Sequence, residues 1–373
     1  MRMKPTIFSV SIAMLTVACS VAKKSTNVDN DIFMLAGTYT AKDSKGIYVY
    51  KMDTVTGNIK PVSFVETQDP SYLAISKNGK YVYSVSEKES KEASSVNTFS
   101  FDKEKGILTF LGSQPAGGGA PCHIVISPDG QKVFTANYMG GSLSSYQVQL
   151  DGILKYENTI TYQGKGFDAE RQTQPHIHFS SYSPDGKYVF VNDLGLDKIY
   201  KFKVEENHQL LAGEPASFEV KKGSGPRHLS FHPNQKWAYL ITEISGDVDV
   251  FDYHHGNLSL KQSIKADSLG ARGSADIHIT PNGKFLYASN RLKGDGIAIF
   301  FINQQDGKLT KIGYQPTGIH PRNFAISPNG KFLICANRDS NLIQVFAIDK
   351  EGLLHDTHQD VKLSMPVFIG FVE

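Results

Sequence analysis

The sequence predicts an all-β protein, a seven-bladed β-propeller whose last blade is closed by strands from the N- and C-terminal ends. Two repeats predict it: a tight-turn motif that recurs about every fifty residues, and an alternating apolar strand that occurs seven times. The length agrees, because residues 32–373 divided among seven units leave about 49 residues for each.

The turn motif has the form Ser/Thr-Pro-Asp/Asn-Gly, followed by a polar residue and an apolar strand. Proline followed by Asn-Gly or Asp-Gly is typical of a tight turn between two strands. Successive copies of this motif are 47 to 56 residues apart, a spacing that is too long for a β-solenoid and too regular for a pair of β-sandwiches. Six copies occur, with small variations, and their fourth residues are Gly79, Gly130, Gly186, Gln235, Gly283 and Gly330.

The alternating strand runs into a Gly- or Asn-containing turn, and its copies begin at Gly46, Ser95, Ser142, Lys198, Asp247, Gly296 and Asn341. One of the seven units therefore lacks a turn motif of its own. Its other strands are predicted at the two ends of the chain, in FMLAGTY (33–39) and MPVFIGF (365–371). A last blade built from both ends closes the ring and hides its strand edges.

The N-terminus predicts export. Two basic residues among the first four precede an apolar run over residues 7–18, which is too short to span a membrane as a mature helix. A small residue before Cys19 is typical of a lipoprotein processing site, although Leu15 lies four residues before the cysteine rather than three. We expect lipid on Cys19; the alternative is an ordinary cleaved secretory peptide.

The chain thus divides into a lipoprotein-type signal peptide (1–19), a flexible tether (20–31) and the propeller (32–373). We expect a monomer anchored in the bacterial cell envelope, at the periplasmic or outer-membrane face, with no membrane contact except the lipid. Lys+Arg (39) and Asp+Glu (37) nearly cancel, which gives no reason to expect nucleic acid as a partner. The remaining cysteines, Cys122 and Cys335, lie in apolar strands of different repeats and are predicted to be buried free thiols.

The innermost strand of each blade lines the channel of a propeller, so functional side chains are expected where these strands begin. The residues that could project into the channel are His123, His176 or His178, Arg227, His228, Asp276, His278, His320, Arg322 and Asn323.

The repeat also serves as an internal control, because a position that only builds a blade should look alike in every copy. Seven residues beyond the fourth residue of the turn motif, small or amide side chains predominate, which favours hydrogen bonding between blades: Ser86, Asn137, Asp193, Thr242, Asn290 and Asn337. Eight residues beyond it the copies vary in charge, which favours a role in a site: Glu87, Tyr138, Leu194, Glu243, Arg291 and Arg338.

Histidines, arginines and an acid at one mouth of the channel suit a small anionic or hydroxyl-rich ligand. Arginine binds carboxylate or phosphate through paired hydrogen bonds, and a nearby Glu or His can transfer a proton or activate water. The alternative is a hydrogen-bonded plug that satisfies the polar lining of the channel. His176 and His178 could face one metal ion, but no third ligand is assured, and we predict neither a metal nor a cofactor.

Five segments stand out together: AGTYT…KGIYVY near the start, Gly-Pro-Arg-His at 225–228, ITE at 241–243, SNR at 289–291 and HPRNFAISPNGKFL at 320–333. In their order and spacing they resemble the propeller-type lactonase family, which contains bacterial 6-phosphogluconolactonase and is related to the fungal 3-carboxymuconate cyclases. The resemblance covers essentially all of 32–373 and implies a seven-bladed propeller that hydrolyses a sugar lactone without a cofactor.

In that family a histidine, two arginines and a glutamate at one channel mouth form the proposed active site. The hypothesis is that the glutamate or the histidine deprotonates a water that attacks the lactone carbonyl, while an arginine stabilises the oxyanion. The motifs place these residues on His176 or His178, Arg227, Glu243 and Arg291, with His123, His228, His320 and Arg322 as candidate substrate-binding residues.

One departure from the family concerns the substrate. 6-Phosphogluconolactone is a cytosolic metabolite, whereas the signal at 1–19 predicts export of this chain. A free aldonolactone or another cyclic sugar derivative is therefore an open alternative. A non-catalytic envelope propeller that binds a carbohydrate or a protein, and a muconate-type lactonizing enzyme, also remain open.

Overall fold

The computed structural model describes residues 1–3, 5 and 30–372. The predicted signal peptide, with Cys19, and the tether up to residue 29 lie almost entirely outside the described residues. Residues 31–372 belong to one compact unit. No helix in the described part is long and apolar enough to cross a membrane.

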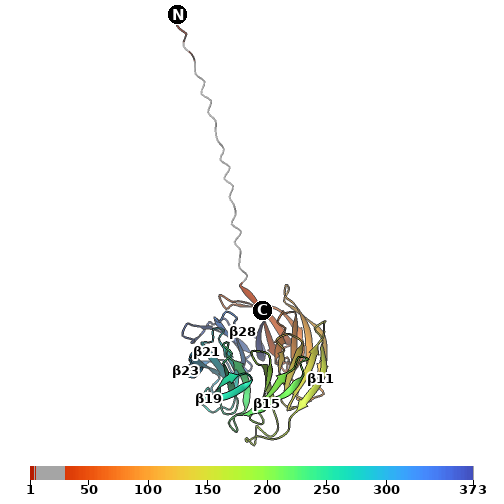
Figure 1. The fold of residues 1–373 in the computed structure, drawn as a ribbon. Helices are drawn as coiled ribbons and strands as arrows, with labels where there is room; N and C mark the ends of the chain where they lie inside the picture. The colour runs from red at the N-terminus through yellow and green to blue at the C-terminus, as the bar shows by residue number, and fades with distance from the viewer. Residues whose placement is uncertain (4, 6–29, 373) are drawn as a thin grey trace. The chain divides into compact units, whose positions relative to one another are not determined.

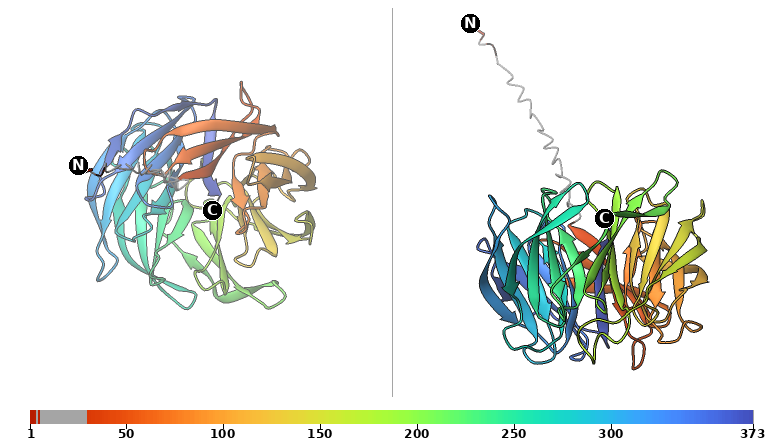
Figure 2. Two further views of the ribbon diagram at one scale, coloured as in Figure 1. Left: turned by 90° about the horizontal axis from the view of Figure 1, so that it is seen from above. Right: turned by 60° about the horizontal axis from the view of Figure 1, so that its bottom comes forward.

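Seven antiparallel sheets are arranged in a ring, which confirms the predicted seven-bladed propeller (Figures 1 and 2). Each sheet is one blade, and residues 30–372 contain strands and turns but no helix. We number the blades in chain order, starting with the blade that contains the first strand.

The strands of each blade follow here in order from the inner to the outer strand. Blade 1 consists of β29 (Pro366–Val372), β1 (Asp31–Thr38), β2 (Gly46–Asp53) and β3 (Ile59–Glu66), and blade 2 consists of β4 (Leu73–Ile75), β5 (Tyr81–Ser86), β6 (Ser95–Asp102) and β7 (Ile107–Pro115). Blade 3 consists of β8 (Pro121–Ile126), β9 (Lys132–Asn137), β10 (Ser142–Val148) and β11 (Leu154–Thr161), and blade 4 consists of β12 (Ile177–Tyr182), β13 (Tyr188–Asp193), β14 (Lys198–Val204) and β15 (Leu210–Glu219). The others are blade 5, β16 (Pro226–Phe231), β17 (Trp237–Thr242), β18 (Asp247–His254) and β19 (Asn257–Lys265); blade 6, β20 (Ser274–Ile279), β21 (Phe285–Asn290), β22 (Gly296–Ile302) and β23 (Leu309–Pro316); and blade 7, β24 (Pro321–Ile326), β25 (Phe332–Asn337), β26 (Leu342–Ile348) and β27 (Leu354–Asp356), with β28 (Val361–Lys362) also paired to β26.

Blade 1 joins the two ends of the propeller. β29 supplies its inner strand and pairs antiparallel with β1, with Phe33 opposite Val372 and Ala36 opposite Ile369. β1 in turn pairs with β2, so the C-terminal strand lies inside the N-terminal one. The predicted closure by segments 33–39 and 365–371 is therefore confirmed, and backbone hydrogen bonds between the chain ends hold the ring shut.

The apolar core lies between neighbouring blades. Second strands such as β17 and β21 are buried on both faces, whereas an outer strand such as β23 alternates between partly buried and exposed residues. Between blades 5 and 6, for example, Trp237, Tyr239, Leu286 and Phe300 pack in one buried cluster. A strand sandwiched between two other sheets has a neighbour on each face, which is why these segments read as continuous apolar runs.

A repeated tyrosine ties one blade to the hairpin of the next. The Tyr83 hydroxyl in blade 2 donates a 3.0 Å hydrogen bond to the carbonyl of Gly152 in the β10–β11 hairpin, and Tyr239 and Tyr287 repeat this contact further round the ring. Gly152 has φ of +81°, and a Cβ there would overlap the ring of Tyr81. The hairpin glycine is thus required both by its backbone conformation and by the ring packed against it.

Both cysteines of the propeller, Cys122 and Cys335, are buried and free, as predicted.

Candidate active site

A β-bulge near the start of several inner strands sets which side chains reach the channel mouth. In β8, β12, β16 and β24 the pairing with the second strand skips one residue, which is Cys122, His178, Arg227 or Arg322 respectively. In the sequence, the proline of PHIH aligns with the prolines that begin the inner strands of other blades. In the structure, Ile177 instead pairs with the second strand where those prolines do. His178 is therefore the structural equivalent of Arg227 and Arg322.

One side chain from each blade forms a ring that spans the channel, the floor of the mouth. From Phe368 to His228 the aromatic and imidazole rings lie 4.2–4.8 Å apart between centroids. The Asp276 carboxylate continues the ring: it lies 2.7 Å from Nδ1 of His228 and accepts a 2.5 Å hydrogen bond from Asn323. The members of the floor are Phe368, Tyr72, His123, Phe179, His228, Asp276 and Asn323.

Two of the predicted substrate-binding residues, His123 and His228, belong to this floor. Both are buried, and His228 and Tyr72, three blades apart, have ring centroids 6.1 Å apart, so the centre of the channel is filled. Burial and then the charge of Arg227 lower the pKa of His228 to about 4. His228, through its contact with Asp276, fits the alternative of a hydrogen-bonded plug, whereas His123 fills the channel by ring packing and its buried Nδ1 has no hydrogen-bond partner among the described residues.

At the mouth, the Glu243 carboxylate is shared by three arginines. Its Oε2 accepts a hydrogen bond from Nε of Arg227 at 2.8 Å and lies 3.1 Å from Nη2 of Arg291. Its Oε1 accepts from Nη2 of Arg171 at 2.5 Å. Arg227, Glu243 and Arg291 are buried, and the structure brings these three predicted residues into direct contact.

The charges of this group do not balance, because three guanidinium groups surround one carboxylate. Burial would raise the pKa of Glu243, but Arg291, Arg227 and Arg171 outweigh it and hold that pKa well below its ordinary value. Burial lowers the pKa of Arg291 to about 9, since Glu243 only partly offsets its desolvation. The mouth therefore keeps an excess of positive charge around an ionised Glu243.

Sequence reasoning missed Arg171. It lies in the segment between β11 and β12, where the turn motifs of blades 3 and 4 are further apart than any other pair. The extra length lets this segment cross towards blade 6: Nη2 of Arg272 lies 2.6 Å from Oδ2 of Asp168, and Nη1 of Arg171 is 3.5 Å from the Arg272 carbonyl. The unusually long spacing between these two turn motifs was the sequence signal that could have identified Arg171.

The two candidate histidines lie against Tyr138 of blade 3. The His176 imidazole stacks on the Tyr138 ring at 4.2 Å between centroids, and its Nδ1 lies 3.0 Å from the Tyr138 carbonyl oxygen. His178 meets the same ring edge-on at 5.6 Å. His176 precedes β12, so strand alternation does not explain the shared orientation. Among the described residues, no group of three His, Cys, Asp or Glu side chains could hold a metal ion.

Burial keeps both imidazoles neutral. It lowers the pKa of His176, which the hydrogen bond to the Tyr138 carbonyl partly restores. The pKa of His178 is held well below its ordinary value by burial and then by the charge of Arg227. Neutral imidazole can accept a proton, which imidazolium cannot.

Asp193 departs from the amides at the same position of other blades. Its Oδ1 accepts three backbone N–H groups, among them that of His176 at 2.8 Å. Burial raises its pKa to about 6. By contrast, Asn137 and Asn290 donate to carbonyls at the end of the preceding blade, which is the role predicted for this position. In blade 4 the same position supports the backbone of a candidate catalytic residue.

Blades 1, 2 and 7 contribute a second arginine–glutamate couple. Nη2 of Arg322 lies 3.5 Å from Oε1 of Glu87, and Oε2 of Glu87 accepts hydrogen bonds from the hydroxyls of Tyr39, at 2.9 Å, and of Ser71. Tyr39 follows β1 at the position that Glu87 and Glu243 hold in their blades. It was missed because blade 1 has no turn motif to count from, and aligning FMLAGTY with the other second strands would have found it.

His320 lies beside Arg291 of the Glu243 group. Its Nε2 lies 3.3 Å from Nη1 of Arg291, its Nδ1 lies 3.4 Å from Oδ2 of Asp339, and Arg322 follows two residues later. Burial and then the charge of Arg291 lower the pKa of His320 to about 3. The side chain is therefore neutral and able to accept a hydrogen bond from the arginine.

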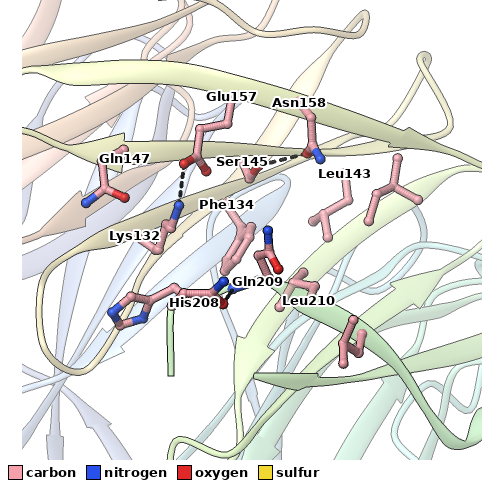
Figure 3. A pocket seen from close by; sticks show the side chains of 13 residues that line it. Lys132, Phe134, Leu143, Ser145, Gln147, Glu157, Asn158, His208, Gln209 and Leu210 are labelled. Atoms are coloured by element: carbon pink, nitrogen blue, oxygen red, sulfur yellow. Dashed lines mark hydrogen bonds and ion pairs between the residues drawn. The ribbon is translucent and has the colours of Figure 1, made fainter. Parts of the chain in front are cut away.

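A separate cavity of about 500 Å³ lies between blades 3 and 4, away from these residues (Figure 3). Lys132 and Glu157 form a 2.5 Å ion pair on its wall, and Ser145 donates to Asn158 nearby. None of the predicted site residues lines it. The convergence of arginines, histidines and Glu243 makes the channel mouth the stronger candidate.

Comparison with known proteins gives consistent matches over the propeller. The model of the family described as "Lactonase, 7-bladed beta-propeller" matches residues 33–371. The 6-phosphogluconolactonase of Formosa agariphila is 41% identical over 327 residues, which are 85% of this chain and 93% of the relative. The 6-phosphogluconolactonase of Bacillus subtilis is 34% identical over 345 residues, 90% of this chain and 97% of the relative.

Solved structures agree. A crystal structure of a Bacteroides fragilis protein aligns with a TM-score of 0.90 and 47% identity, covering 93% of this chain and 99% of that chain. The structure of a periplasmic gluconolactonase from Pseudomonas aeruginosa aligns with a TM-score of 0.87 and 31% identity, covering 92% of this chain and 99% of that chain.

Proposed function

The chain belongs to the seven-bladed β-propeller lactonase family and hydrolyses a sugar lactone, and we propose that the reaction takes place at the Glu243 cluster. The relatives are lactone hydrolases, so the activity is that of a carboxylic ester hydrolase. The observation that supports this location is the group of three arginines around one buried carboxylate. It provides positive charge where the carbonyl oxygen of a lactone becomes an anion.

His176 is the proposed general base. The Tyr138 carbonyl accepts the hydrogen of Nδ1, which leaves Nε2 as the proton acceptor. Nε2 takes a proton from a water molecule while the water oxygen bonds to the carbonyl carbon, and the carbonyl electron pair moves to its oxygen. Arg227 or Arg291 stabilises that oxyanion. The carbonyl then re-forms, the ring C–O bond breaks, and the imidazolium returns the proton to the departing alkoxide.

Glu243, the other candidate base, is better suited to aligning the arginines. Its two oxygens already receive contacts from three guanidinium groups. Its pKa is far below that of water-activating bases, so taking up a proton there is unfavourable. We assign Glu243 the role of positioning Arg227 and Arg291 towards the carbonyl oxygen.

The test is acid release in a pH-stat assay with gluconolactone and its 6-phosphate. Wild-type protein should exceed the spontaneous rate, Arg227→Met should lower kcat/KM about 10²–10³-fold, and His176→Gln about 10²–10⁴-fold. Wild-type rates in both variants would place the reaction elsewhere. Ligand-induced stabilisation without acid release would indicate a binding protein instead.

We also propose that the enzyme is exported and anchored by lipid on Cys19. The support is the basic and apolar N-terminal sequence that ends in a small residue before this cysteine. Labelling with an alkyne fatty acid should mark the wild-type chain in the membrane fraction and fail to mark Cys19→Ala. An unlabelled, released wild-type protein would favour a cleaved secretory peptide.

A further inference from the structure

The mouth contains two arginine–glutamate couples at equivalent positions of the repeat. Arg227 and Arg322 are both skipped by a bulge near the start of an inner strand. Glu243 and Glu87 both stand eight residues beyond the fourth residue of a turn motif. Two sites built from the same parts can be compared directly, and their differences indicate what each one binds.

The couples differ in charge. Glu243 faces three arginines, which leaves that group positive. Glu87 has one arginine, Arg322, at 3.5 Å, and its other oxygen is occupied by the hydroxyls of Tyr39 and Ser71. The second couple is therefore neutral overall, and the carboxylate and guanidinium side chains each keep 15% of their surface accessible.

Both couples influence the electrostatics of the same buried histidine at the mouth. The positive charges of Arg227, Arg322 and Arg291 all depress the pKa of the buried His178, after the larger effect of burial. Arg322 also lies over the ring of Tyr39, with its guanidinium carbon 5.5 Å from the ring centroid, which holds its plane in one orientation.

We propose that Arg322, Glu87 and Tyr39 form a subsite for the hydroxyl groups of the sugar lactone that are remote from its carbonyl, and that this subsite disfavours a phosphate. The inference rests on the proposed function, since it takes the carbonyl to bind at the Glu243 cluster.

The chemistry of the two groups supports hydroxyl recognition. A hydroxyl both accepts and donates, so one sugar hydroxyl can accept from Arg322 while it or its neighbour donates to Oε1 of Glu87. A phosphate dianion would accept from Arg322 but would place negative oxygens beside the Glu87 carboxylate. Such a like-charge contact is a specificity element directed against the wrong substrate.

The experiment compares kcat/KM for gluconolactone and for its 6-phosphate, using the purified full chain. Wild-type protein should prefer gluconolactone, and Glu87→Gln should shift the ratio towards the phosphorylated lactone by about tenfold or more. Tyr39→Phe removes a hydroxyl but no carboxylate, so it should raise KM for gluconolactone without favouring the phosphate. Circular dichroism and melting curves show whether each variant is folded.

Glu89→Gln is the matched control, because Glu89 is an exposed carboxylate two residues along the same loop. It should leave the ratio unchanged. A wild-type preference for the phosphorylated lactone, or equal shifts in Glu87→Gln and Glu89→Gln, would overturn the subsite. Failure of the proposed function is a different result, in which the wild-type chain hydrolyses neither lactone.

Discussion

Nε of Arg227 donates a 2.8 Å hydrogen bond to Oε2 of Glu243, which lies sixteen residues later in the same blade. The bulge in β16 presents the arginine and the end of β17 presents the glutamate, so one hairpin supplies both partners. Arg291 of blade 6 and Arg171 of the β11–β12 segment complete the group. A single carboxylate therefore holds together side chains from three parts of the ring.

Replacing Glu243 by Gln should destabilise the propeller as well as reduce activity. The substitution keeps the shape but leaves three arginines, two of them buried, without their counter-charge, which costs about 3–5 kcal/mol in comparable buried pairs. Urea unfolding measures the change. Glu351→Gln, which removes an exposed carboxylate that lies 3.4 Å from Nζ of Lys350, should alter the unfolding free energy by less than about 0.5 kcal/mol. Equal effects of the two variants would contradict the shared role of Glu243.

The same carboxylate predicts a loss of stability in acid. The pKa of Glu243 in the folded protein is below its ordinary value of 4.5, so below that pH the unfolded chain binds the proton more readily. Its contribution is therefore fully present above pH 4.5 and decreases as the pH falls towards the folded pKa. Unfolding free energies measured from pH 7 to pH 3 should fall less steeply for Glu243→Gln than for wild type; parallel curves would argue against this linkage.

The pH profile of hydrolysis should reveal His176. Burial lowers its pKa below 6.5, and the protonated imidazole cannot act as base, so kcat/KM should stay high down to a pH below 6.5 and then decrease. The His176→Gln variant should lose this acidic limb together with most of the rate. His355→Gln, which changes an exposed histidine, should retain the wild-type profile. An unchanged limb in His176→Gln would move the base to another residue, with His178 the first to examine.

Replacing Asp276 by Asn should destabilise the floor of the channel. An asparagine there would direct an NH₂ group at donors, because Oδ2 accepts from Nδ2 of Asn323 and from the backbone N–H of Phe324. Leaving buried donors unpaired costs about 1–3 kcal/mol each. Urea unfolding should show this loss for Asp276→Asn and little change for Asp252→Asn, where the side chain is half exposed. Comparable stability of both variants would mean that the floor does not depend on this carboxylate.

Two turn glycines offer a matched pair for blade packing. Gly130 and Gly152 have φ of +78° and +81°, but a Cβ on Gly130 would meet nothing within 4 Å, whereas on Gly152 it would overlap Tyr81. Gly130→Ala should cost about 1–2 kcal/mol for its backbone conformation. Gly152→Ala should cost about 1–3 kcal/mol more because the ring must move. Denaturant midpoints of the two variants measure the difference, and equal midpoints would show that the hairpin and ring can separate freely.

Much of the fold and part of the site could be predicted because the repeat makes spacing visible. The seven copies of the alternating strand predicted the number of blades, and the unit without a turn motif predicted closure by the chain ends. The same comparison singled out Glu243 and Arg291, since blade-building positions resemble one another and these do not. Arg227 could be predicted because it stands at the start of an inner strand.

Other features depended on strand register within a blade or on contacts between blades, which no local period encodes. The bulge in β12 made His178, rather than His176, the equivalent of Arg227, and this register is set by the pairing of β12 with β13 inside blade 4. Arg171 contacts Glu243, which lies 72 residues later in the sequence, because the long segment between β11 and β12 brings it there.

The sequence by itself determined the seven-bladed, self-closing ring and the presence of histidines, arginines and Glu243 near one mouth, because strand spacing and residue type are local properties. Only the tertiary structure decided which of those side chains touch. It placed His123 and His228 in a floor, brought three arginines to one carboxylate, and set Tyr39 beside Glu87. These contacts follow from the packing of neighbouring blades around a common axis, which brings side chains distant in sequence into the same small volume.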